Sequence, residues 1–223
     1  MTMQTQKQTN PFVGTHDENI LVVRRSDLFT QEHGGIAAFQ GLEAIPHAHW
    51  VETILAKKEF LPRSLMESDP TYKQIIPYLI FTHAGKLFLM QRQAKTNDTR
   101  LQSKFSLGIG GHIREEDIQS HNTNGKTDIV EWAKREFHEE IDYKDDLTVT
   151  AIGTLNDDSN DVGKVHIGFV YLLKGDSANI KVHEELQSGE LLSIEECEQF
   201  YDRMENWSKI VFDWIKENKK VLD

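Results

Sequence analysis

The chain has 223 residues, of which 38% are hydrophobic and 9% aromatic, so it can form a packed core and is unlike a disordered chain. Its net charge of −11 argues against a nucleic-acid partner, because nucleic-acid-binding proteins neutralise phosphates with clustered cations. A run of about 18 apolar residues is absent, so no membrane partner is expected. The single cysteine, Cys197, excludes an internal disulfide and, with a polar N-terminal segment, favours a cytoplasmic location.

The first part of the chain, residues 1–70, is predicted to form an N-terminal extension. Residues 1–18 are polar and are expected to be partly disordered. Residues 20–23 are apolar and rich in β-branched side chains, which predicts a short strand, and residues 48–57 indicate a short helix. The extension could cap the core, complete a sheet or form the surface of a homodimer, and the sequence leaves these alternatives open.

Residues 71–223 are predicted to form the main domain, which begins with a β-hairpin and ends with a helical region. The hairpin follows from two apolar runs that flank a tight Ala84-Gly85 turn. In chain order, we expect strands at 75–82 and 86–91, a polar loop at 93–104, a strand at 105–109, a polar surface loop at 114–127, a helix from 128, strands at 147–155 and 165–173, and a final helical region capped by Ser193 and Glu196.

The helix beginning at Asp128 contains the most informative pattern in the chain. Apolar residues recur every four positions from 129 to 141 and define one buried face. Glu136, Glu139 and Glu140 share another face in the last turns. Like charges at this spacing repel, and the negative end of the helix dipole disfavours them further. A hard divalent cation would reverse that repulsion, and oxygen ligands suit Mg²⁺ or Mn²⁺. The alternative is a solvated acidic helix end.

Glycine residues ahead of this helix add a second feature. Gly110 and Gly111 follow a β-like run and allow the backbone to turn tightly and to approach a ligand. Together with residues 135–140, whose sequence is Arg-Glu-Phe-His-Glu-Glu, they resemble the signature box of the Nudix hydrolase family. The box departs from the family pattern in three ways: about ten residues are inserted, Asp117 stands at the position of an expected glutamate, and Asp142 replaces the closing glycine.

The resemblance implies an α+β fold, a Nudix-type α/β/α sandwich with a mixed sheet. It also implies that metal ligands are provided by Glu136, Glu139, Glu140 and the carbonyl of Gly110. Catalytic roles are expected for Glu139, Glu140 and a glutamate after the box, Glu185. A diphosphate needs positive charge near its oxygens, and the candidates just before the glycine turn are Arg92, Arg100 and Lys104.

The expected function is therefore metal-dependent hydrolysis of a diphosphate linkage in a nucleoside diphosphate derivative or a similar small molecule. A non-catalytic, nucleotide-binding regulatory domain is the alternative. Isopentenyl diphosphate isomerase shares the fold, but its catalytic cysteine would lie just before the box, whereas the only cysteine here is Cys197. Two further groups are interpreted as structural rather than catalytic: the acidic turn Asp157, Asp158 and Asp161, and the histidines His112 and His166.

Overall fold

The computed structural model describes residues 17–30, 35–93, 104–120, 129–183 and 186–222. Within these ranges, the backbone alone is described for Gln119, Ser120, Val130, Glu131, Lys134, Arg135 and Glu136. No helix in the described ranges is both long enough and apolar enough to cross a membrane.

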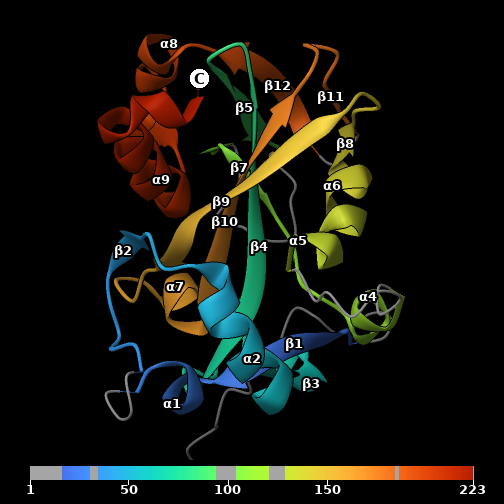
Figure 1. The fold of residues 1–223 in the computed structure, drawn as a ribbon, viewed down its shortest axis with the longest axis vertical. Coiled ribbons are helices and arrows are strands. Elements are labelled where there is room, and N and C mark those ends of the chain that lie inside the picture. The colour runs from blue at the N-terminus through green and yellow to red at the C-terminus, as the bar shows by residue number, and fades with distance from the viewer. Residues whose placement is uncertain (1–16, 31–34, 94–103, 121–128, 184–185, 223) are drawn as a thin grey trace, which may run out of the picture.

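A twisted mixed sheet forms the centre of the molecule (Figure 1). Its two central strands, β4 and β10, are parallel, and the strands outside them are antiparallel. Both central strands are buried on both faces, which explains their continuous apolar sequence. The main strand order is β12 (Leu186–Leu192), β5 (Lys86–Arg92), β4 (Tyr72–His83), β10 (His166–Gly175), β9 (Leu147–Asn156) and β2 (Gly41–Glu43).

Helices cover both faces of this sheet and create two separate cores. Successive side chains of β4 point to opposite faces of the sheet. Ile75, Leu79 and Phe81 lie on one face, and Tyr78 and Ile80 lie on the other. The first face packs against α2 (His47–Lys57), α5 (Ile129–Trp132) and α6 (Lys134–Glu140). The second packs against α8 (Ile194–Glu198) and α9 (Asn206–Glu217). The structure therefore confirms the predicted α/β/α sandwich with a mixed sheet.

Much of the N-terminal extension completes the sheet. Strand β1 (Asn19–Arg24) pairs with β4 and with β3 (Glu59–Pro62), while β2 pairs with β9. The predicted strand and helix in this region are confirmed as β1 and α2. The short helices α1 (Arg25–Leu28) and α3 (Arg63–Met66) connect these strands to their neighbours. Residues 1–16 lie outside the described residues, whereas the Asp17 carboxylate accepts hydrogen bonds from Ser64. A domain boundary at residue 70 stays a prediction.

Several predicted elements are divided in the structure. The strand expected at 105–109 is β6 (Phe105–Ser106) followed by β7 (Gly108–Gly110). The helix expected from Asp128 appears as α5 and α6, separated at Ala133, while Asp128 itself lies outside the described residues. The final helical region comprises α8, η2 (Tyr201–Arg203), α9 and η3 (Lys219–Leu222), and the predicted capping box at Ser193 and Glu196 is confirmed.

The prediction of a polar loop over 114–127 is wrong for its first part. Residues Glu115–Ser120 form helix α4. Asp117 is buried and accepts a hydrogen bond from the backbone N–H of Arg114 at 2.8 Å, so it closes the first turn of α4. Ile118 packs against the core on the α6 side of the sheet. Residues 121–127 lie outside the described residues. The remaining elements are α7 (Asp161–Val165), β8 (Ile141–Asp142) and β11 (Lys181–Val182).

Candidate active site

Helix α6 presents its last glutamates at the edge of the sheet. Buried Phe137 anchors the helix in the core, and α6 lies against β7, the strand that ends at Gly110. Glu139 is exposed, whereas Glu140 is only 7% exposed. The side chain of Glu136 lies outside the described part of the structure, although its backbone belongs to α6. The fold thus brings the glutamate-bearing helix and the glycine turn together.

The glycines of β7 allow this strand to lie close to β4. A Cβ atom on Gly108 would lie 2.1 Å from Cζ of Tyr78, and one on Gly110 would lie 3.3 Å from side-chain atoms of Ile76 and Tyr78. The ring of Tyr78 cannot move aside easily, because its hydroxyl hydrogen-bonds to Ser208 at 2.8 Å and to Glu205. The absence of a side chain at Gly108 is therefore required for the turn that positions the Gly110 carbonyl.

Arg92 points to the same face of the sheet as α6. In strand β5, Phe88 and Met90 pack into the core on the α6 side, and Leu87 and Leu89 pack on the α9 side. Because successive side chains alternate between faces, Arg92 follows Phe88 and Met90. Its side chain is half-buried, and its Nε atom is buried without a hydrogen-bond partner among the described residues. Arg92 is therefore held in place rather than fully solvated.

Lys104 shares this orientation but is exposed. The backbone N–H of Arg92 donates to the carbonyl of Lys104 at 3.0 Å, which extends the pairing of β5 with β6. Phe105, the next residue, packs on the α9 side, so the alternation directs Lys104 to the α6 side. Two of the three predicted substrate-binding cations therefore face the side of the sheet that α6 covers. The third, Arg100, lies outside the described residues.

A short backbone connection links Arg92 to the end of α6. The N–H of His183 donates to the carbonyl of Glu140 at 2.9 Å, and the N–H of Leu186 donates to the carbonyl of His183 at 3.2 Å. Leu186 then pairs with Arg92 between β12 and β5. The C-terminal end of the glutamate helix and the C-terminal end of β5 consequently meet at one place. Glu185, the predicted catalytic residue of this segment, lies outside the described residues.

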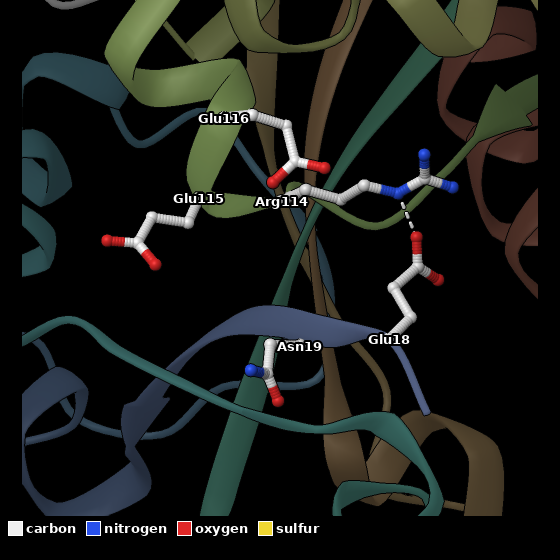
Figure 2. Close-up of a pocket in the computed structure, with 5 residues that line it drawn as sticks. All are labelled: Glu18, Asn19, Arg114, Glu115 and Glu116. Atoms are coloured by element: carbon white, nitrogen blue, oxygen red, sulfur yellow. Dashed lines mark hydrogen bonds and ion pairs between the residues drawn. The ribbon is translucent and has the colours of Figure 1, made fainter. Parts of the chain in front are cut away.

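A polar hollow of about 520 Å³ lies between the start of β1 and the start of α4 (Figure 2). It is lined by Glu18, Asn19, Arg114, Glu115 and Glu116. The Arg114 guanidinium extends to the carboxylate of Glu18, with which it forms an ion pair, whereas Glu115 points away from that pair (Figure 2). Three carboxylates against one guanidinium make this hollow unfavourable for an anionic substrate without bound cations. The sequence did not indicate it, because Glu18 and Arg114 are far apart in the chain.

The acidic turn after β9 is a structural network, as its sequence suggested. Asp158 accepts hydrogen bonds from Arg25 and from Lys73, each at 2.9 Å, and these contacts hold its pKa well below the usual range. Burial lowers the pKa of Lys73 to about 8 despite the Asp158 carboxylate. Asp157 accepts from Gln40 at 2.5 Å. These carboxylates are already engaged by protein donors, which ties the turn to β4 and α1.

Cys197 is remote from the glutamate helix. It is fully buried in α8 and belongs to the core on the α9 side of the sheet. Burial raises the pKa of its thiol to about 12, so a thiolate does not form at neutral pH. The isomerase alternative, which needs a reactive cysteine at the box, does not fit this position.

The donors at the helix end fit a hard cation. Glu139 and Glu140 could offer carboxylate oxygens and Gly110 a carbonyl oxygen, and Mg²⁺ and Mn²⁺ prefer an all-oxygen set. The exposure of Glu139 leaves this set open to water and to a ligand. The chemistry of the described donors therefore agrees with the metal role that the box implied.

No protein-family model matches the chain. Among curated proteins, YmaB of Bacillus subtilis strain 168 is 35% identical over 217 residues, covering 92% of this chain and all of YmaB. Among solved structures, Tm1382, a candidate Nudix hydrolase, superimposes with a TM-score of 0.72 at 28% identity and covers 90% of this chain and all of Tm1382. Both likenesses extend over at least nine tenths of this chain. The chain belongs to the same family as YmaB, and it is a Nudix hydrolase.

Proposed function

We propose that this Nudix hydrolase cleaves a diphosphate linkage in a nucleoside diphosphate derivative or a similar small molecule, with Mg²⁺ or Mn²⁺ as cofactor. The observation that supports the proposal is the packing of α6, the helix that carries Glu139 and Glu140, against β7, the strand that ends at Gly110. Solvation alone does not account for this placement, because Glu140 is buried at the negative end of a helix.

The metal would be held by Glu136, Glu139, Glu140 and the carbonyl of Gly110. A bound divalent cation would offset the charge of the diphosphate oxygens and lower the pKa of a water molecule for attack on phosphorus. Buried Glu140 is suited to holding a cation, since its position is restricted by the core. Exposed Glu139 can reach water, and we assign it the role of proton acceptor, with Glu185 as the alternative.

Substrate binding would rest on cations on the α6 side of the sheet. The protein carries a net charge of −11, so an arriving diphosphate is repelled unless specific cations offset that charge. Arg92 is the principal candidate, because its planar guanidinium can bind two phosphate oxygens at once and its side chain is half-buried. Exposed Lys104 would add weaker, solvent-screened attraction, and Arg100 remains the third candidate from the sequence.

The proposal is tested with a panel of nucleoside diphosphate derivatives, by measuring nucleotide or phosphate release with Mg²⁺, with Mn²⁺ and with a chelator. We expect turnover of at least one diphosphate that requires the metal. Binding of such compounds with no turnover would instead support a regulatory nucleotide-binding domain. A cytoplasmic location and a homodimer belong to the same proposal, and light scattering of the purified protein tests the dimer.

A further inference from the structure

We propose that Glu67, His112 and His166 form a second metal site, selective for Zn²⁺ or a similar borderline divalent cation, on the face of the sheet opposite the glutamate helix. One potential ligand atom from each of these residues lies within 4.8 Å of the others. The three come from separate segments: Glu67 follows α3, His112 follows the glycine pair, and His166 begins β10. Two imidazoles and one carboxylate are a frequent zinc ligand set.

The surroundings of both histidines orient a nitrogen lone pair for such a site. The carbonyl of Val162 can only accept, so Nδ1 of His166 donates to it at 2.7 Å, and Nε2 is left as the acceptor nitrogen of a neutral ring. Nε2 of His112 lies 2.6 Å from Oε1 of Gln74. Gln74 is fixed in this orientation because its Nε2 donates to the carbonyl of Met66 at 3.1 Å.

Nε2 of His112 is therefore the donor, and Nδ1 is its acceptor nitrogen. Ligating histidines usually donate their other N–H to an oxygen in this way, which fixes the tautomer and the ring direction. The imidazole rings are 5.8 Å apart between centroids.

This cluster is separate from the proposed magnesium site. His166 pairs with Gln74 in the central parallel ladder, so their side chains share one face. That face is the α9 side. Ile76, two residues after Gln74 on β4, packs in the core on the α9 side, and the ring centroid of Trp207 on α9 lies 6.3 Å from that of His166. Glu139, Glu140 and Arg92 lie on the other side. A cation bound by the histidines would therefore not replace the one at α6.

The charge around the cluster is compatible with a cation. Arg63 on α3 is paired with Glu67 at 3.3 Å and with Glu18 at 3.7 Å, and Arg114, two residues after His112, is paired with Glu18. Lys73, next to Gln74, is paired with Asp158. Ligand atoms around tetrahedral Zn²⁺ lie about 3.4 Å apart, given bonds of about 2.1 Å. The cluster must therefore contract by at most roughly 1.4 Å, which side-chain rotation can supply.

A cation at this position would connect the N-terminal extension to the catalytic turn. Glu67 lies between α3 and β4, and His112 is two residues after Gly110. Three protein ligands leave the fourth zinc position to water. We expect bound zinc to hold the extension against the glycine turn and to raise the melting temperature.

The test uses full-length protein stripped with a chelator, then titrated with ZnCl₂ in excess Mg²⁺ so that the α6 carboxylates are occupied. We expect one Zn²⁺ per chain by calorimetry and elemental analysis, and a higher melting temperature. Glu67→Gln and His166→Asn should each weaken zinc binding at least about tenfold. His49→Asn, an exposed histidine on α2, is the matched control and should bind zinc normally, as should the Glu139→Gln/Glu140→Gln double variant.

X-ray absorption of the zinc-loaded wild-type protein gives a second readout that needs no variant. We expect imidazole scattering from two nitrogen ligands, together with oxygen. An all-oxygen shell, less than one equivalent of zinc, or unchanged affinity in Glu67→Gln and His166→Asn would each overturn the proposal. Loss of zinc in the Glu139→Gln/Glu140→Gln variant alone would assign the ion to α6. Failure of diphosphate hydrolysis would leave this outcome unaffected, because zinc binding is measured directly.

Discussion

The backbone N–H of Arg92 donates to the carbonyl of Lys104 at 3.0 Å, and this pair directs two cations to the side of the sheet that α6 covers. The two side chains differ in how far they are restrained by burial. Arg92 is half-buried at the end of β5, whereas Lys104 is exposed. A charge that is already positioned contributes more to binding than one that must be ordered from solvent.

We therefore predict that Arg92→Ala raises the Michaelis constant for a diphosphate substrate by about 10–150-fold, the range for loss of a charged hydrogen-bonded contact of roughly 1.5–3 kcal/mol. Lys104→Ala should raise it by less than about tenfold, because exposed charges are screened. Arg92→Lys separates charge from geometry, and we expect only partial recovery. Steady-state kinetics of the three variants is the measurement. Equal and small effects would exclude Arg92 from the binding site.

The glutamates of α6 should matter for activity and not for metal-free stability. Glu139→Gln and Glu140→Gln should each lower kcat by about 10²–10⁴-fold, the range for loss of a catalytic proton acceptor or charge. In a chelator, both variants should melt at the wild-type temperature or slightly above it, because carboxylates at the negative helix end are unfavourable. A marked loss of stability in metal-free Glu139→Gln would show that this exposed carboxylate is structural instead.

The segment after the glycine turn should divide into a required part and a dispensable part. Asp117→Ala should lower the free energy of unfolding by about 1–3 kcal/mol, because it removes a buried acceptor from the N–H of Arg114. Deletion of residues 121–126 should leave the fold intact, since the segment is polar and loop length costs little entropy. Chemical denaturation of both variants tests this, and unfolding of the deletion variant would contradict it.

The Asp158 network should make stability sensitive to acid. Its folded pKa lies below the ordinary 3.8, so the unfolded chain binds more protons as the pH falls below about 4, and stability decreases there. Asp158→Asn should lower stability at pH 7 and flatten this acid dependence. Asp161→Asn, which removes an exposed partner of Lys164, should change neither. Melting temperatures measured from pH 7 to pH 3 provide the comparison, and parallel profiles for all three proteins would refute the assignment.

Lys73 should make stability depend on pH in the alkaline range. Its folded pKa is about 8, lowered from 10.5 mainly by burial, so between these values the unfolded chain carries the extra proton. Stability attributable to Lys73 therefore rises with pH across that window. Lys73→Met should remove this rise while leaving Asp158 with Arg25 as its partner. A wild-type stability that is flat from pH 8 to pH 10 would contradict the burial of a charged lysine.

Local patterns in the sequence determined the main elements and the glutamate helix end. The β4–β5 hairpin, strands β9 and β10 and the Ser193 cap follow from apolar periodicity and turn chemistry, which act over a few residues. The placement of Glu139 and Glu140 next to Glu136, three and four residues before them, follows from the helical repeat in the same way. The fold class was inferred from the resemblance of the glycine pair and residues 135–140 to the Nudix box.

Relations between distant segments were decided by the tertiary structure alone. Periodicity could not show that β1 pairs with β4, that Arg92 meets the end of α6 through His183, or that Glu67 lies beside His112. Such contacts depend on sheet order and strand register, which are set by how all the apolar faces pack together. Helix α4 was missed for a related reason. Its sequence is polar, and it is stabilised by burial of Asp117 and partial burial of Ile118 against the rest of the fold rather than by a local pattern.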